Sequence, residues 1–159
     1  APSRGLGDVY KRQHNNQEER FSLYLGYLTH MLTDEKFILE IHPYVLQRIA
    51  VTGYDRDNPQ TYVKFGRDVD QIDFRLVKEF PGIDKAYQAL CQVTPYEIAD
   101  YITEQELTAS REWIKNYFFE TEHTIEDPIF LPYQEMYQFI PEAVAQICDR
   151  LPEYITSGV

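Results

Sequence analysis

Residues 21–37 read FSLYLGYLTHMLTDEKF and indicate the fold class of the chain. Phe21, Leu25, Leu28 and Leu32 recur at spacings of four, three and four, which is one apolar stripe of an amphipathic α-helix. The stretch does not alternate between apolar and polar residues as a half-buried strand does. It therefore predicts a helix with one face towards a core.

The same helical period continues through the rest of the chain. Phe65, Val69, Ile72, Leu76 and Phe80 form a second apolar stripe, which Pro81-Gly82 ends. No strand pattern, internal repeat or linker is visible, and 159 residues suit one domain with a core. We therefore predict a single all-α domain of about six helices. The expected elements also include a helix over 36–51 with a break near Pro43, loops at 53–59 and 123–131, a short helix over 84–92, and a last helix carrying 139–151.

Two further helix starts carry the pattern of a capping box. Thr94-Pro95-Tyr96-Glu97 and Thr103-Glu104-Gln105-Glu106 both place a glutamate three residues after a threonine, and the first adds a proline at the first helical position. We expect a helix to begin at each of these two threonines. Leu107, Ile114 and Phe118 then form the buried face of the second.

The composition limits the classes of partner. The net charge is −11; Arg4, Lys11 and Arg12 against Asp8 give +2 in the opening stretch, so the remainder carries −13. An acidic body repels nucleic acid and gains nothing from anionic lipid surfaces, and we expect no nucleic-acid partner. No apolar run approaches the roughly 20 residues of a transmembrane helix.

The two cysteines are far apart in the sequence. Cys91 and Cys148 form no CxxC pair, and each falls on an apolar helical face. We expect buried free thiols rather than a disulfide or a metal site. Such thiols are compatible with a reducing cytoplasm.

His30 and Asp34 are the main candidates for chemistry. Residues four apart project from the same helix face, and Gly26 one turn earlier leaves room for another backbone or a ligand. An imidazole nitrogen and a carboxylate oxygen on successive turns are two workable zinc ligands. The spacing is also that of a plain His–Asp hydrogen bond, so on spacing alone both interpretations stay open.

The sequence of this predicted helix as a whole resembles that of a helix in the zinc-dependent phospholipase C family. Small bacterial members carry a helix much like G-Y-x-x-H-x-x-T-D followed by an aromatic residue. The matching positions here are Gly26, Tyr27, His30, Thr33, Asp34 and Phe37. Residues 66–74 (GRDVDQIDF) and 130–144 (FLPYQEMYQFIPEAV) also look like downstream helices of such proteins.

The resemblance implies an all-α fold that holds zinc ions in a cleft between helices. Metal-bound water would attack a phosphodiester, and the metals would stabilise the charge of the transition state. His30 and Asp34 are carried over as zinc ligands, and His42 is the next candidate. The family places a further histidine shortly after the aspartate, whereas His42 comes eight residues after it, and nothing before Phe21 except His14 resembles a metal motif.

Two other groups could bind a cation. Asp68, Asp70 and Asp73 follow Arg67, although at helical spacing such residues more often form a solvated or salt-bridged face. A second group lies in the expected loop and its surroundings, where an exposed acidic patch is the other interpretation. That group consists of Glu120, Glu122, His123 and Glu126.

The opening stretch does not resemble protein sequence. Residues 3–13, SRGLGDVYKRQ, match the translation of an adapter used in transposase-based sequencing libraries, and the second half, DVYKRQ, matches the transposon end. We therefore expect residues 1–13 to be a non-native, disordered segment and 14–159 to be a domain that lacks its natural N-terminal part.

The sequence thus predicts a fragment of a zinc-dependent phospholipase C-like hydrolase. Its substrate would be a phospholipid or another phosphodiester, and the fragment would be inactive or incomplete. The alternative is a non-catalytic helical binding or structural domain in which His30 and Asp34 form a structural polar pair.

Overall fold

The computed structural model describes the backbone of residues 3–55, 57–98 and 100–156, and their side chains except those of residues 3–17, 19 and 156. The expectation for residues 1–13 concerns residues that are outside this description or lack described side chains. The adapter origin and the disorder of that segment therefore stay predictions, as does the division of the chain into one segment and one domain.

The all-α prediction is confirmed over the described range. The helices, in chain order, are α1 (Ser3–Glu40), α2 (His42–Val51), α3 (Pro59–Glu79), α4 (Ile83–Gln92), α5 (Glu104–Ile114), the π-helical segment η1 (Lys115–Glu120) and α6 (Tyr133–Thr156). No strand occurs in this part of the chain, where the only β-type pairing is a bridge between Ile98 and Ile102. None of these helices is long and apolar enough to cross a membrane.

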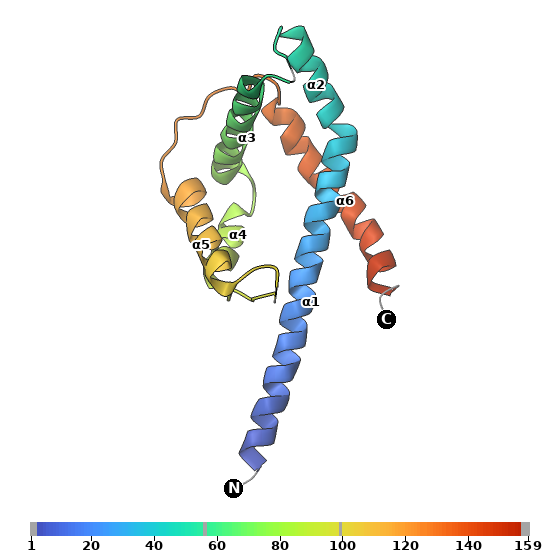
Figure 1. The fold of residues 1–159 in the computed structure, drawn as a ribbon, viewed down its shortest axis with the longest axis vertical. Coiled ribbons are helices and arrows are strands. Elements are labelled where there is room, and N and C mark those ends of the chain that lie inside the picture. The colour runs from blue at the N-terminus through green and yellow to red at the C-terminus, as the bar shows by residue number, and fades with distance from the viewer. Residues whose placement is uncertain (1–2, 56, 99, 157–159) are drawn as a thin grey trace.

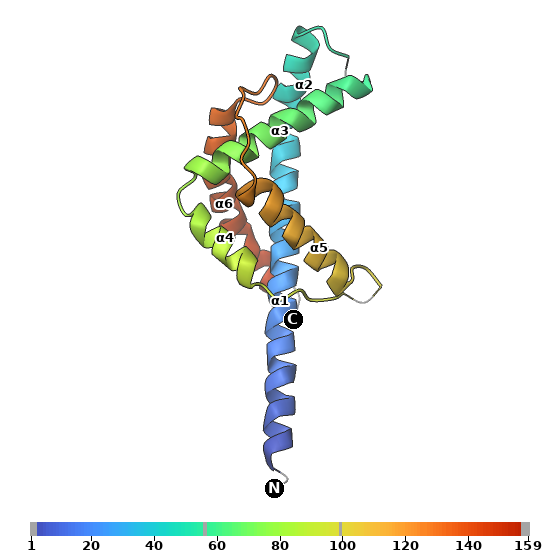
Figure 2. The ribbon, with the colours of Figure 1, turned by 90° about the vertical axis from the view of Figure 1, so that its left-hand side faces the viewer.

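The helices form two groups. α1 and α2 follow one another along one side of the molecule, and α6 crosses α1 (Figure 1). α4 and α5 lie on the other side, and α3 runs across from the α2 end towards them (Figure 2). The first turns of α1 extend beyond the rest of the molecule in both views.

The break between α1 and α2 lies where proline predicts it. α1 ends at Glu40, and α2 begins at His42 with Pro43 in its first turn, where the missing N–H costs no helical hydrogen bond. The last turn of α1 buries Lys36, whose ammonium bonds Glu40 at 2.5 Å and lies 6.0 Å from the ring centre of Phe139 in α6. This contact fastens the end of α1 to α6.

The core lies between α2, α3 and the segment that leads into α6. Its buried members are Val45, Ile49, Ile72, Phe130, Leu131 and Tyr133. The predicted stripe of α3 contributes as expected, with Ile72 buried and Phe65, Val69 and Leu76 packed against the cluster. α3 begins with Asn58, whose side chain accepts a hydrogen bond from the Gln60 N–H at 2.9 Å, and with Pro59.

Only the second of the two predicted capping boxes forms. The Thr103 hydroxyl accepts from the Glu106 N–H at 3.2 Å, and the Glu106 carboxylate accepts from the Thr103 N–H at 2.9 Å. The prediction of a helix at Thr94 is wrong, since residues 93–97 are irregular. The backbone carbonyl of Val93 accepts from Arg111 of α5 instead.

This difference predicts unequal effects of two similar substitutions. Thr103→Ala should lower the free energy of unfolding by about 1 kcal/mol, because it removes an N-cap. Thr94→Ala should change it by less than about 0.5 kcal/mol, because no helix begins there. Urea denaturation followed by circular dichroism measures both. Equal losses would contradict the assignment of the caps.

The burial predicted for the cysteines is wrong. Cys91 on α4 and Cys148 on α6 are free and exposed. Burial was predicted because apolar residues lie near each cysteine in the sequence. Those residues face inward, whereas the cysteine on the same helix faces solvent. Phe139, Ala143 and Ile147 are the buried residues of that stretch of α6.

Candidate functional site

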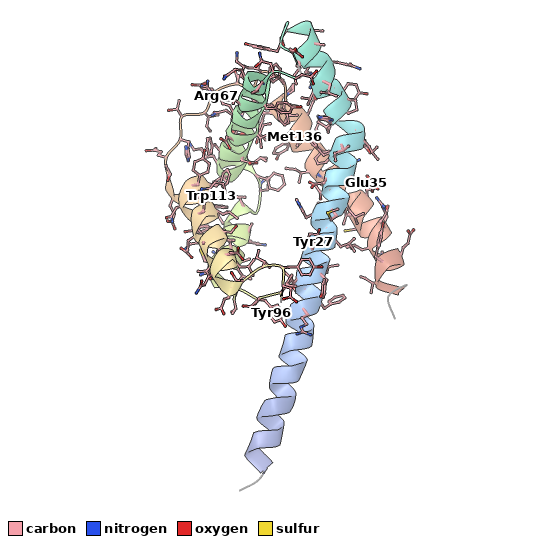
Figure 3. All side chains as sticks on the ribbon, in the orientation of Figure 1. Tyr27, Glu35, Arg67, Tyr96, Trp113 and Met136 are labelled. Atoms are coloured by element: carbon pink, nitrogen blue, oxygen red, sulfur yellow. The ribbon has the colours of Figure 1, made fainter. Side chains whose placement is uncertain are left out.

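The described part of the chain contains an open groove between α1 and α5. Its volume is about 600 Å³, and the segment between α4 and α5 forms its third wall. Figure 3 shows Tyr96 on this segment where it reaches α1, with Tyr27 further along the helix. The lining residues are Ser22, Leu23, Gly26, Tyr27, Leu90, Val93, Thr94, Pro95, Tyr96, Leu107, Ser110, Arg111 and Ile114.

Two arginines hold the third wall in place. Arg20 of α1 donates to the Tyr96 hydroxyl at 2.5 Å, and its guanidinium lies 5.8 Å from the centre of that ring. Arg111 of α5 donates to the Val93 carbonyl at 2.7 Å. The segment is thereby tied to both helices.

The groove suits a ligand with an apolar chain. Six of its thirteen lining residues are aliphatic or proline, and two more are tyrosines. Its side-chain polar groups are hydroxyls and the cationic guanidinium of Arg111. Apolar walls with a few placed polar groups, at a volume of about 300–1,000 Å³, are typical of small-molecule sites. Gly26 lines the groove, and no described atom lies within 4 Å of the position that a Cβ would take there.

His30 and Asp34 lie directly beyond one end of the groove. His30 follows Gly26 by one helical turn, so the pair continues the face of α1 that the groove uses. The Nε2 atom of His30 lies 3.4 Å from the Oδ2 atom of Asp34, and the side chains are 65% and 51% exposed. The expected juxtaposition of these two groups is therefore present.

His42 does not join this pair. It begins α2, about three helical turns after His30, and lines a small apolar cavity of about 120 Å³ with Val45, Ile49 and Thr61. No group of three or more His, Cys, Asp or Glu side chains converges within the described residues. A catalytic zinc ion takes three protein ligands and an open position. His30 and Asp34 could supply two of these three ligands. The described residues therefore do not form a complete catalytic zinc site.

The three aspartates of α3 do not act as one group. Asp68 is 2% exposed, and its carboxylate accepts hydrogen bonds from the backbone N–H groups of Ile129, Phe130 and Leu131 at 2.9, 2.5 and 3.2 Å. The expected solvated face is therefore wrong for Asp68. Asp70 accepts from the Tyr117 hydroxyl at 3.2 Å.

Asp73 is half-buried beside Asp70. Burial, and then the negative charge of Asp70, raise the pKa of Asp73 to about 6. The folded protein therefore holds the proton more tightly than the unfolded chain, whose pKa is 3.8. Below about pH 4 both states are protonated and the carboxyl costs nothing. Above about pH 6 the folded state carries the full penalty.

We therefore expect Asp73→Asn to raise the free energy of unfolding at neutral pH. The gain should be about 1–2 kcal/mol, less than the full shift corresponds to, because the carboxyl keeps part of its exposure to water. It should shrink as the pH falls from 6 to 4. Urea denaturation over this range measures it, with the exposed Asp149→Asn as control. A gain that does not depend on pH would contradict the shifted titration.

The predicted loop of residues 123–131 forms, but His123 lies against aromatic rings. Its ring stacks on Phe74 with centroids 3.7 Å apart and planes 6° apart, and its Nε2 atom lies 2.6 Å from the Tyr117 carbonyl oxygen. Glu126 pairs with Arg67, and Glu120 accepts from the Tyr87 hydroxyl. These side chains therefore have structural partners and do not converge as metal ligands.

Sequence reasoning missed the groove. Its walls come from residues 22–27, 90–96 and 107–114, and no local pattern shows that these stretches meet. The mistaken helix at Thr94 also hid the irregular wall. One available signal was the surplus of apolar residues on α1, where Leu23 and Tyr27 lie off the stripe that begins at Phe21.

Comparison with known proteins identified no relative. No protein-family model, curated protein or solved structure matches the chain.

Proposed function

We propose that this chain is a helical binding domain for a single-chain zwitterionic phospholipid. The observation that carries the proposal is the apolar groove of about 600 Å³ between α1 and α5. The aliphatic walls formed by Leu23, Leu107 and Ile114 favour an acyl chain, since each buried methylene contributes about 0.8 kcal/mol. Arg111 pairs with Glu112 at 3.1 Å and donates to the Val93 carbonyl at 2.7 Å, and its remaining N–H groups are donors for the phosphate.

The net charge supports the choice of headgroup. The chain carries −11, so a ligand with a net negative charge is repelled as it approaches. A zwitterionic headgroup has no net charge and escapes this repulsion. Its phosphate can still approach Arg111 at short range, where the local contact outweighs the distant charges.

A second candidate is the zinc-dependent phospholipase C-like hydrolase, and one observation favours it. His30 and Asp34 stand 3.4 Å apart beyond one end of the same groove, and this candidate places the headgroup of the bound lipid there rather than at Arg111. In this candidate the pair supplies two zinc ligands, and the remaining ligands lie outside the set that the described residues bring together. This chain would then bind its phospholipid substrate without completing the reaction.

Titration with myristoyl-lysophosphatidylcholine, below its micellar concentration, tests the binding function. We expect a dissociation constant in about the micromolar range, and a loss of at least about tenfold in Ser110→Trp, whose indole fills the groove. Ala109→Trp is the matched control, because Ala109 is the adjacent residue of α5 and lines a different hollow. Lysophosphatidylglycerol with the same chain should bind more weakly, most clearly at low salt.

Two results would contradict the proposal: no binding by the unaltered chain, or equal affinities of the unaltered chain and Ser110→Trp. Metal analysis after dialysis against zinc separates the two candidates. The hydrolase predicts bound zinc that His30→Ala loses. The binding domain predicts that His30→Ala binds the lipid as before and that zinc content does not change.

A further inference from the structure

Gly26 occupies the interior of α1, where glycine is unfavourable. Glycine loses more conformational freedom on folding than any other residue, so a helix that contains it is less stable than the same helix with alanine. Two structural features can nevertheless require glycine: a positive φ angle, or a neighbour too close for a Cβ atom. Neither is present at Gly26, because its backbone is helical and no described atom lies within 4 Å of the position that a Cβ would take.

The space that a side chain at position 26 would enter is the groove itself. Gly26 and Ser22, which are one helical turn apart, both line the groove from α1. The Cα–Cβ bonds of a helix tilt towards its N-terminus, so a side chain at position 26 would lie over the turn that contains Ser22. Without that side chain, this part of the groove wall is bare helix backbone.

Gly66 of α3 separates the effect of glycine on the helix from its effect on the groove. It also lies in a helix interior, it is exposed, and no described atom lies within 4 Å of its Cβ position. It is not among the residues that line the groove. A substitution at Gly66 therefore reports the change in helix stability alone, whereas the same substitution at Gly26 also changes the width of the groove.

We propose that Gly26 is a specificity-determining residue of the groove, which lets the acyl chain of the ligand lie against the backbone of α1. The inference rests on the proposed function, since the width of the groove matters only if a chain binds there. Leu107 and Ile114 of α5 supply the apolar wall on the other side of that chain. Methylene groups that occupy the space of the missing side chain gain close contacts with both walls. A side chain at position 26 would narrow the groove and displace them.

Gly26→Leu and Gly66→Leu in the full chain test the inference through two separate measurements. Both substitutions should raise the midpoint of urea denaturation, because leucine is a much better helix former than glycine. Only Gly26→Leu should weaken the binding of myristoyl-lysophosphatidylcholine, by at least about tenfold, because its side chain takes the place of the acyl chain. A lower urea midpoint in Gly26→Leu would show a structural role for the glycine and would overturn the inference.

A second lipid separates an effect on the acyl chain from an effect on the headgroup. Gly26→Leu adds no charge, so it should weaken the binding of lysophosphatidylglycerol with the same chain by about the same factor. Unchanged affinity in Gly26→Leu, an equal loss in Gly66→Leu, or a loss for only one of the two lipids would overturn the inference. These results would leave the proposed function standing, provided that Ser110→Trp loses binding. A lack of binding by the unaltered chain would overturn both.

Discussion

Replacing Asp68 with asparagine is expected to lower the free energy of unfolding by about 3 kcal/mol or more. The buried carboxylate accepts three hydrogen bonds from consecutive backbone N–H groups, and these bonds hold the segment that leads into α6 against α3. An amide keeps one acceptor oxygen and turns an NH₂ group towards backbone donors. Buried donors left without acceptors cost about 1–3 kcal/mol each.

Urea denaturation of Asp68→Asn and of Asp149→Asn measures this effect. Asp149 is exposed on α6, so the same chemical change there should alter the stability by less than about 0.5 kcal/mol. Similar stabilities of the two variants would show that the carboxylate of Asp68 does not hold the segment. Because Phe130 and Leu131 are among the residues that it holds, the loss should also loosen the core.

The second large effect is expected for Phe130→Ala. Phe130 is fully buried, and its ring forms a T-shaped pair with that of Tyr54, with ring centres 5.6 Å apart. Removing a buried phenyl ring leaves a cavity and costs about 3–5 kcal/mol. Thermal and urea denaturation measure the loss.

The neighbouring residue provides the control for this variant. Ile129 is 51% exposed, so Ile129→Ala should cost less than about 1 kcal/mol. Equal losses at the two positions would contradict the assignment of Phe130 to the core. The two predictions concern one structural unit, since Asp68 binds the backbone of the segment whose side chains fill the core.

Periodic apolar residues made most of the fold predictable. The stripe from Phe65 to Phe80 corresponds to α3, the break at Pro43 separates α1 from α2, and Thr103 caps α5 as its pattern indicates. These features depend on residues that are close in the sequence. The spacing of residues within one helix is therefore enough to predict where that helix lies and where it begins.

The errors arise where distant residues decide the outcome. The pattern at Thr94 matches that at Thr103, but Arg111 of another helix binds the backbone carbonyl of Val93. Asp100 also has a left-handed backbone conformation, with φ 68°, which a continuous α-helix does not contain. Asp68 carries the sequence signature of a solvated helix face, and only the fold shows that three backbone N–H groups meet it.

The candidate site was predictable in part. The spacing of His30 and Asp34 predicted their juxtaposition, which the 3.4 Å separation of their atoms bears out, whereas their role as zinc ligands stays a prediction. His42 was chosen because it was the next histidine along the chain, and it lies on a different helix with apolar neighbours. The groove beside the pair could not be predicted, because its walls come from three separate stretches.

The most direct test of the proposed function is methyl NMR of the full chain titrated with lysophosphatidylcholine that carries a spin label on its acyl chain. The account predicts broadening of the methyl signals of Leu23, Leu107 and Ile114, which line the groove, while those of the core residues Ile49 and Ile72 stay sharp. Broadening confined to Met31 and Ile38, which are exposed on α1 outside the groove, or no selective broadening, would contradict it.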